Sequence, residues 1–192
     1  MDNLIALTDI NISVPRNNNI IIDSLRINIG DVIQIKAPSG RGKSFFYHTL
    51  LGMTEASKTL YRDDLHLSKL FCYCPAYLSF FSDTVIEELQ RIYAAESEIQ
   101  ALIKHNIMDS SFLHQKCRDL SSGQNQLLVF IRAILSKKPI LIFDELTNAM
   151  DFELKLKVND YIFNYLLKNK AIIFSIHESS VLVPNKTINL SS

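Results

Sequence analysis

"APSGRGKS", residues 37–44, matches the pattern G-x-x-x-x-G-K-[ST] of a phosphate-binding loop except at the first position, where Ala37 replaces glycine. The pattern is informative only when a strand leads into it and a helix follows it. Residues 32–36, "VIQIK", are short and rich in β-branched residues, which is typical of a strand, and residues 43–51 have helical spacing. The flanking segments therefore predict a loop of the right geometry despite Ala37.

The residue types in this loop suit a bound phosphate chain. Gly40 and Gly42 lie where the backbone must wrap around phosphate oxygens and a side chain would intrude. Lys43 supplies a positive charge to the β- and γ-phosphates, and the hydroxyl of Ser44 at a helix N-terminus suits Mg²⁺. If the first position requires a positive φ, Ala37 costs about 1–2 kcal/mol of local strain. The residues expected to contact a nucleotide are Ala37, Pro38, Ser39, Gly40, Arg41, Gly42, Lys43, Ser44 and Phe45. The alternative is a glycine-rich turn ahead of a core helix.

A second motif, "ILIFDE" at residues 140–145, ends an apolar strand with two acidic residues. A continuously apolar strand is typical of the centre of a parallel sheet that is covered on both faces. Asp144 is therefore expected beside the loop, where it can hold Mg²⁺ together with Ser44. Glu145 follows directly and can orient or deprotonate an attacking water. The alternative is an ordinary buried strand that ends in a solvated acidic pair.

Strand and helix patterns alternate along the 192 residues, which predicts one α/β domain with a mostly parallel core sheet. Alternating apolar and polar residues at 4–14, a turn at 16–19 and a second strand at 20–29 predict an antiparallel β region ahead of that sheet. The stretch from Asp83 to about Asn106 is helical in pattern. The other expected elements are a helix after Gly123, a helix at about 152–168, and strands at 70–74, 139–144, 171–176 and near 187–190.

The composition excludes several classes of protein. Lys plus Arg and Asp plus Glu number 20 each and are scattered, so we expect no nucleic-acid partner. Three cysteines are too few for a disulfide framework, and a metal site at Cys72 and Cys74 lacks further ligands. No apolar run reaches the ~20 residues of a membrane span. The 47% content of hydrophobic residues is high, which indicates either a large core or an apolar surface that a partner covers.

A third motif, "LSSGQ" at residues 120–124, precedes the second expected helix and resembles the LSGGQ signature of ATP-binding cassette (ABC) proteins. Other segments resemble motifs of the same family in the same order. "PAYLSFFSDTVIEEL" (75–89) resembles the Q-loop segment, "TNAMD" (147–151) resembles the D-loop, and His177 follows a strand as the switch histidine does. The chain thus resembles an ABC nucleotide-binding domain over nearly its whole length, most closely the exporter type.

This resemblance implies a P-loop NTPase fold of ABC type over residues 1–192, with a short helical subdomain at about 77–120. It implies that two such domains, identical or different, enclose two ATP molecules with Mg²⁺. Each ATP then contacts one subunit's loop and the other's signature, here Ser121, Ser122, Gly123 and Gln124. Glu145 and His177 become the expected catalytic residues, with ATP hydrolysed to ADP and phosphate. A transmembrane permease, as a separate chain or domain, would hold the protein at the cytoplasmic side of a membrane.

Departures from the family pattern concern residues around the catalytic core. Ala37 replaces the first loop glycine, Ala76 replaces the Q-loop glutamine, and Val14 stands near the position of the aromatic residue that stacks on adenine. A methyl group cannot coordinate a cation, so metal binding must rest on Ser44, Asp144 and water. We therefore expect an ATPase that retains its catalytic residues but makes weaker contacts with the metal and the nucleobase. The alternatives are a regulatory partner that barely turns ATP over, and a soluble ABC ATPase outside transport.

The aromatic segment beside the Q-loop offers an explanation for the apolar surplus. In the family, this groove receives a coupling helix of the permease. Tyr77, Leu78, Phe80 and Phe81 are the candidate contacts. The alternative is that these side chains pack inside the helical subdomain.

Overall fold

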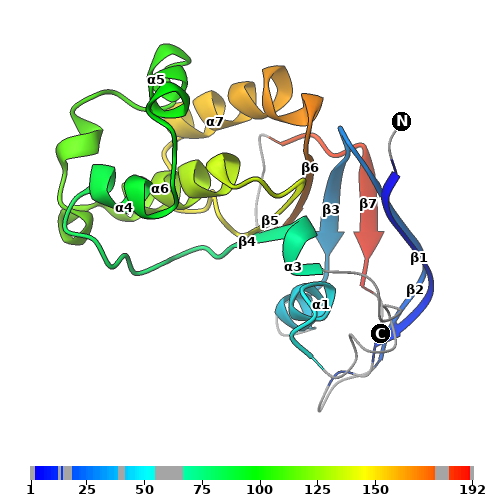
Figure 1. Cartoon of the computed structure of the whole chain (residues 1–192). Helices are drawn as coiled ribbons and strands as arrows, with labels where there is room; N and C mark the ends of the chain where they lie inside the picture. The colour runs from blue at the N-terminus through cyan, green and yellow to red at the C-terminus, as the bar shows by residue number, and fades with distance from the viewer. Residues whose placement is uncertain are drawn as a thin grey trace.

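The computed structural model of the chain describes residues 3–12, 14, 19–38, 42–54, 67–175 and 182–190 (Figure 1). The elements follow one another in this order: β1 (Asn3–Ile12), β2 (Ile20–Asn28), β3 (Val32–Lys36), α1 (Lys43–Leu50), α3 (Leu67–Leu70), β4 (Phe71–Cys74), α4 (Val85–Arg91), α5 (Glu96–Lys104), two 3₁₀ turns (Phe112–His114 and Cys117–Asp119), α6 (Ser122–Leu135), β5 (Ile140–Asp144), α7 (Phe152–Asn164), a 3₁₀ turn (Leu166–Lys168), β6 (Ala171–Ser175) and β7 (Lys186–Asn189).

The core is a five-stranded sheet in the order β4-β5-β6-β3-β7, in which every neighbouring pair is parallel. β1 and β2 form a separate antiparallel pair, with Ile10 opposite Ile22. In Figure 1 this pair lies to one side of the sheet, while α4, α5, α6 and α7 lie to the other. The predicted α/β fold class, with a mostly parallel sheet and an antiparallel N-terminal β region, is confirmed.

Both faces of the central strands are buried, which explains their continuous apolar sequences. Ile140 and Ile142 of β5 pack in the cluster that contains β1, β2 and Phe46 of α1. Leu141 and Phe143 point the other way, into the cluster formed with α6 and α7. Because successive side chains of a strand point to opposite faces, a strand covered on both sides must be apolar at every position. The four apolar residues before Asp144 are therefore explained by the position of β5 inside the sheet, where both of its faces are covered.

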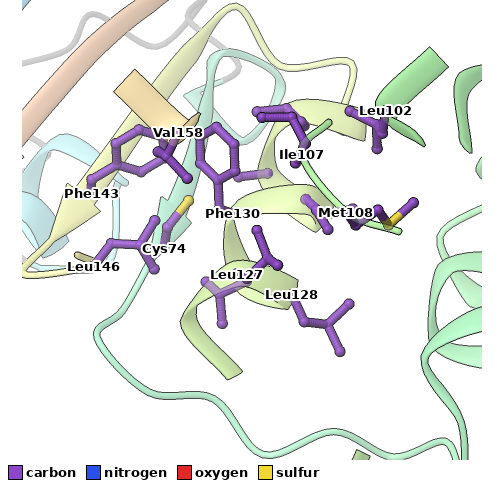
Figure 2. Packing of buried hydrophobic residues seen from close by; sticks show 14 of the residues in the cluster. Cys74, Leu102, Ile107, Met108, Leu127, Leu128, Phe130, Phe143, Leu146 and Val158 are labelled. Carbon is purple, nitrogen blue, oxygen red and sulfur yellow. The ribbon is translucent and has the colours of Figure 1, made fainter. Parts of the chain in front are cut away.

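Phe130 of α6 lies at the centre of the larger cluster. Figure 2 shows its ring beside Val158 of α7 and Phe143 of β5, and the Phe130 and Phe143 ring centroids are 5.8 Å apart. Leu127 and Leu128 of the same helix are also buried in this cluster. Burying such side chains typically contributes about 1.5–3 kcal/mol each. The helix that follows the "LSSGQ" motif is thus held firmly against the sheet.

The prediction of one helix from Asp83 to about Asn106 is wrong, because the structure contains two helices there, α4 and α5. Tyr93 adopts a positive φ of 57°, which an α-helix does not accommodate. The backbone N–H of Ala95 then donates to the Glu98 carboxylate at 2.8 Å, which caps the start of α5. Apolar residues recur with helical spacing on both sides of this break, so their periodicity alone did not reveal it.

Other differences concern element ends. The helix expected at about 152–168 is regular only to Asn164 and continues as a 3₁₀ turn. The helix expected from Gln124 begins two residues earlier, at Ser122. The bounds of a helical subdomain at about 77–120 stay a prediction. Among the described residues, no helix is long and apolar enough to cross a membrane.

Candidate nucleotide site

The start of α1 is shaped by Gly42. Its φ is 90°, in the left-handed region, and a Cβ there would lie 3.4 Å from side-chain atoms of Val14 and Ile20. The left-handed conformation therefore favours glycine here, while the added Cβ would make only ordinary van der Waals contacts. Ala37 does not adopt a positive φ, so the strain considered for the first loop position is absent. Three residues of the predicted contact set lie outside the described residues: Ser39, Gly40 and Arg41.

Val14 serves the core beneath the loop. Only 7% of its surface is exposed, and it belongs to the cluster that contains β1 and β2. Its side chain supports Gly42 and offers little surface to a ligand. Whether Val14 takes the place of an aromatic residue that stacks on adenine stays a prediction.

The other described loop residues lie at the carboxyl end of β3. Pro38 is exposed there, and the Nζ of Lys43 donates a hydrogen bond to the carbonyl oxygen of Ala37 at 3.3 Å. The Phe45 side chain packs against the core cluster, which leaves its backbone as the part that can face a ligand. The amino group of Lys43 thus reaches back to the first residue of the loop.

Asp144 is the point at which several elements converge. The Ser44 hydroxyl, from α1, lies 3.4 Å from its Oδ2. Tyr73, on β4, donates to the same oxygen at 2.8 Å, and Ser175, on β6, donates to Oδ1 at 2.8 Å. The predicted pairing of Ser44 with Asp144 is present in the structure, although whether the pair holds a metal stays a prediction. Tyr73 and Ser175 were not singled out from the sequence.

Glu145 has an unusual backbone conformation for a non-glycine residue, with a φ of 58°. Its N–H donates to the Ser175 carbonyl at 3.1 Å, and its carbonyl accepts from the Asn148 N–H at 3.2 Å. The Asn148 side-chain amide also lies 3.4 Å from Glu145 Oε2. Strained residues persist where surrounding contacts determine them, and they cluster at functional sites. These contacts hold Glu145 in a turn directly after β5.

The "LSSGQ" motif forms the cap of α6. Ser121 Oγ accepts from the Gln124 N–H at 3.2 Å, while Gln124 Oε1 accepts from the Ser121 N–H at 2.9 Å, so the two residues make a reciprocal capping box. Gln124 Nε2 donates to the Gln115 side chain at 3.0 Å. Ser122 is exposed in the first turn, and Gly123 follows it. The motif therefore presents a helix N-terminus, a feature that favours anions.

A model of the family described as "ABC transporter" matches residues 22–148, about two thirds of the chain, and includes the loop, the "LSSGQ" motif and the acidic pair. The chain belongs to the ABC transporter family. Members of this family hydrolyse ATP. The family resemblance inferred from the motifs is confirmed.

Curated relatives include both importers and exporters. The chain is 24% identical to the zinc import ATP-binding protein ZnuC of Wolbachia sp. subsp. Brugia malayi, covering 91% of this chain and 74% of that protein. It is 28% identical to the lactococcin-G-processing and transport ATP-binding protein LagD of Lactococcus lactis, covering 82% of this chain and 25% of LagD. These relatives support the family but not the exporter type in particular.

The solved structure of a bacterial Atm1-family ABC exporter with ATP bound superposes on the chain with a TM-score of 0.77. The identity is 19%, and the alignment covers 96% of this chain and 36% of the exporter. At this identity the likeness shows the fold.

Two amides that sequence reasoning missed join the ABC motifs to one another. Buried Gln126 donates from Nε2 to the Ala76 carbonyl at 3.1 Å, and its Oε1 accepts from the Ala149 N–H at 2.9 Å. Buried Asn125 donates to the Leu78 carbonyl at 2.9 Å and accepts from the Leu78 N–H at 3.4 Å. The first two turns of α6 therefore hold the Q-loop segment on one side and the D-loop on the other. The sequence feature that could have identified Asn125 and Gln126 is their position directly after the "LSSGQ" motif.

The aromatic segment after the Q-loop is divided between core and surface. Leu78 and Phe80 pack against the larger core cluster, whereas Tyr77 is 66% exposed and Phe81 is 85% exposed. The whole segment, together with Arg118 and Leu120, lines a cavity of about 400 Å³. The core interpretation is therefore correct for Leu78 and Phe80, whereas a permease contact at the exposed Tyr77 and Phe81 stays a prediction.

The predicted catalytic residue His177 lies outside the described residues, as does the segment around it, 176–181. Its place beside Glu145 therefore stays a prediction. Ser175, the last residue of β6, is described and already contacts Asp144. β6 therefore ends beside Asp144, and His177 is two residues further along the sequence.

Gly123 should tolerate no side chain. An added Cβ would lie 2.9 Å from the Ala149 carbonyl oxygen, and this neighbour is backbone and cannot swing aside. Gly123→Ala is therefore expected to lower the free energy of unfolding by about 1–3 kcal/mol, the usual cost of overpacking. Urea unfolding followed by circular dichroism measures this. Ser122→Ala, at an exposed position of the same turn, is the matched control and should stay within about 0.5 kcal/mol of wild type. Equal stability of Gly123→Ala and wild type would contradict the close packing of signature and D-loop.

Proposed function

We propose that this chain is the ATP-hydrolysing subunit of an ABC transporter and that it binds ATP at the loop around Lys43. The observation that carries the proposal is the convergence of Ser44 and Asp144, which lie 3.4 Å apart although 100 residues separate them in sequence. A loop lysine, a hydroxyl and a carboxylate on adjacent elements are the groups that position a phosphate chain and its cation. A glycine-rich turn with no ligand does not require Asp144 at that place.

The donor set at Asp144 fits Mg²⁺. This cation prefers oxygen ligands and retains several waters, so it needs few protein groups. Asp144 and Ser44 supply a carboxylate and a hydroxyl, and Ala76 adds no side-chain ligand. When bound, Mg²⁺ would neutralise charge on the β- and γ-phosphate oxygens. Lys43 would add a positive charge on the same phosphates.

Glu145 is the proposed general base. Its carboxylate would accept a proton from water as the water oxygen attacks the γ-phosphorus and the bond to the leaving ADP oxygen breaks. Backbone hydrogen bonds with Ser175 and Asn148 support this proposal, because they hold Glu145 in the turn directly after Asp144. His177 is proposed to assist at the γ-phosphate.

The subunit is proposed to work as a pair with a second nucleotide-binding domain, of the same or another chain. The capped start of α6, with Ser121, Ser122, Gly123 and Gln124, would face the partner's ATP. A membrane permease is the second proposed partner, and it would hold the chain at the cytoplasmic side of a membrane. The exposed Tyr77 and Phe81 are the proposed contacts with it.

Conservative substitution of Glu145 tests the enzymatic part of the proposal. Glu145→Gln keeps size and hydrogen bonding but removes the basic carboxylate, so ATP hydrolysis should fall by about 10²–10⁴-fold while ATP binding persists. Phosphate release measures the first quantity and calorimetry the second. The variant should also dimerise with ATP and not with ADP, because a negative charge near the γ-phosphate is lost.

Glu153→Gln, at an exposed acid on α7, is the matched control and should hydrolyse ATP at the wild-type rate. If Glu145→Gln also hydrolyses ATP at the wild-type rate, Glu145 is not the base. A slow wild type with an equally slow variant would favour the regulatory partner, for which the methyl group of Ala76 is the specific support.

Charged substitutions in the aromatic segment test the proposed permease contact. Tyr77→Asp combined with Phe81→Asp should release a tagged protein from the membrane fraction of cells that express it natively, since burying a carboxylate in an apolar contact is costly. ATP binding should be unchanged. Tyr93→Asp, at an aromatic side chain that is 93% exposed and does not line the cavity of this segment, should leave membrane association intact. Retention of the double variant in the membrane fraction would refute this contact.

A further inference from the structure

Tyr73 occupies a position between the loop helix and the acidic strand. It lies on β4, next to β5 in the sheet, with Tyr73 paired to Ile142. Its ring packs against two side chains of α1: the ring centroid of Tyr47 is 6.3 Å away, and that of His48 is 5.8 Å away at an edge-on angle. The ring is therefore held on one side by α1, and its hydroxyl points to Asp144.

The hydrogen bonds around Asp144 determine how its carboxylate is turned. The torsion that rotates a carboxylate is broad and has no strong intrinsic preference. Here Ser175 donates to Oδ1 at 2.8 Å and Tyr73 donates to Oδ2 at 2.8 Å, from strands on either side of β5. Ser44 lies at a longer distance of 3.4 Å from Oδ2. The two short bonds thus set the plane of the carboxylate, and the long one marks where a cation can enter.

At neutral pH the Tyr73 hydroxyl keeps its proton and can donate a hydrogen bond. Burial raises the pKa of its hydroxyl, and the hydrogen bond and negative charge of Asp144 raise it further. A carboxylate oxygen has room for more than one partner. Occupation of one side of Oδ2 by Tyr73 leaves the side toward Ser44 for the metal.

Tyr47 provides a comparison within the same site. It is fully buried, and the Asp144 and Glu145 charges act on it. In the part of the chain that the structure describes, no hydrogen bond joins its hydroxyl to the Asp144 carboxylate. Of two neighbouring tyrosines, only Tyr73 therefore contacts the carboxylate.

We propose that Tyr73 is a positioning residue that holds Asp144 in the orientation required for Mg²⁺ and so links β4 and the Q-loop segment to the metal site. Ala76 follows three residues later, and its carbonyl accepts from Gln126 of α6. Displacement of this segment relative to α6 would therefore be transmitted to Asp144 through the Tyr73 hydroxyl. The inference rests on the proposed function, since it concerns the metal that accompanies ATP.

Tyr73→Phe removes only the hydroxyl and keeps the ring. Calorimetry with a non-hydrolysable ATP analogue, once with EDTA and once with Mg²⁺, separates nucleotide affinity from the gain that the metal confers. Loss of a group that orients a metal ligand typically costs about 10–100-fold in metal affinity. We expect Tyr73→Phe to reduce the Mg²⁺-dependent gain about 10-fold and to leave the affinity in EDTA within about twofold. A residue with a merely structural role would alter both affinities or neither.

Tyr47→Phe is the matched control and should leave both affinities within about twofold, because among the described residues its hydroxyl does not contact Asp144. Ser175→Ala removes the other short bond to Asp144 and should reproduce the effect of Tyr73→Phe, which keeps the test decisive if Tyr73→Phe folds poorly. Mn²⁺ in place of Mg²⁺, observed by electron paramagnetic resonance, reports metal binding directly.

If the wild type gains affinity from Mg²⁺ and both Tyr73→Phe and Ser175→Ala retain that gain, the inference is overturned and the proposed function stands. If the wild type binds no nucleotide in either condition, the proposed function fails and this inference fails with it.

Discussion

The structure depends on one geometric constraint, that parallel strands end at the same edge of the sheet. β3, β5 and β6 are buried in the core, and each carries a functional segment at its carboxyl end. β3 leads to the loop, β5 ends with Asp144 and β6 ends with Ser175. Parts of the chain that are far apart in sequence therefore meet at one edge of the sheet, and the 3.4 Å approach of Ser44 to Asp144 is the result. The apolar character of these strands is required for this arrangement, because both faces are covered.

A second constraint joins the site to the helices around it. The amides of Asn125 and Gln126, at the start of α6, bind the backbone of the Q-loop segment and of the D-loop. Unpaired polar groups are costly inside a protein, so buried amides with defined partners favour a single arrangement. Gly123 allows the D-loop backbone to approach the same helix. The signature helix, the D-loop and the Q-loop segment therefore form one packed unit, and movement of any of them affects the others.

Sequence reasoning predicted the parts of the fold that depend on local pattern. The strand before Gly42, the helix after it and the two-sided strand before Asp144 have strong local signals, and the structure contains them. It failed where a local break was masked by periodicity, as at Tyr93, where one residue with a positive φ separates two helices. It also missed Tyr73, whose role arises only when β4 lies beside β5 and α1 packs over it. Contacts of this kind are set by the sheet order, which the sequence pattern does not state.

The central claim is that the loop around Lys43 binds Mg·ATP. Titration calorimetry of Lys43→Ala against wild type tests it most directly, with Lys104→Ala on α5 as a control for loss of a surface charge. Lys43 would interact with charged phosphate oxygens, and such interactions contribute about 1.5–3 kcal/mol. The account predicts that Lys43→Ala binds Mg·ATP about 10- to 100-fold more weakly, with an unchanged circular dichroism spectrum, while Lys104→Ala binds as wild type does. Equal affinity of the Lys43→Ala and wild-type proteins for Mg·ATP would contradict it.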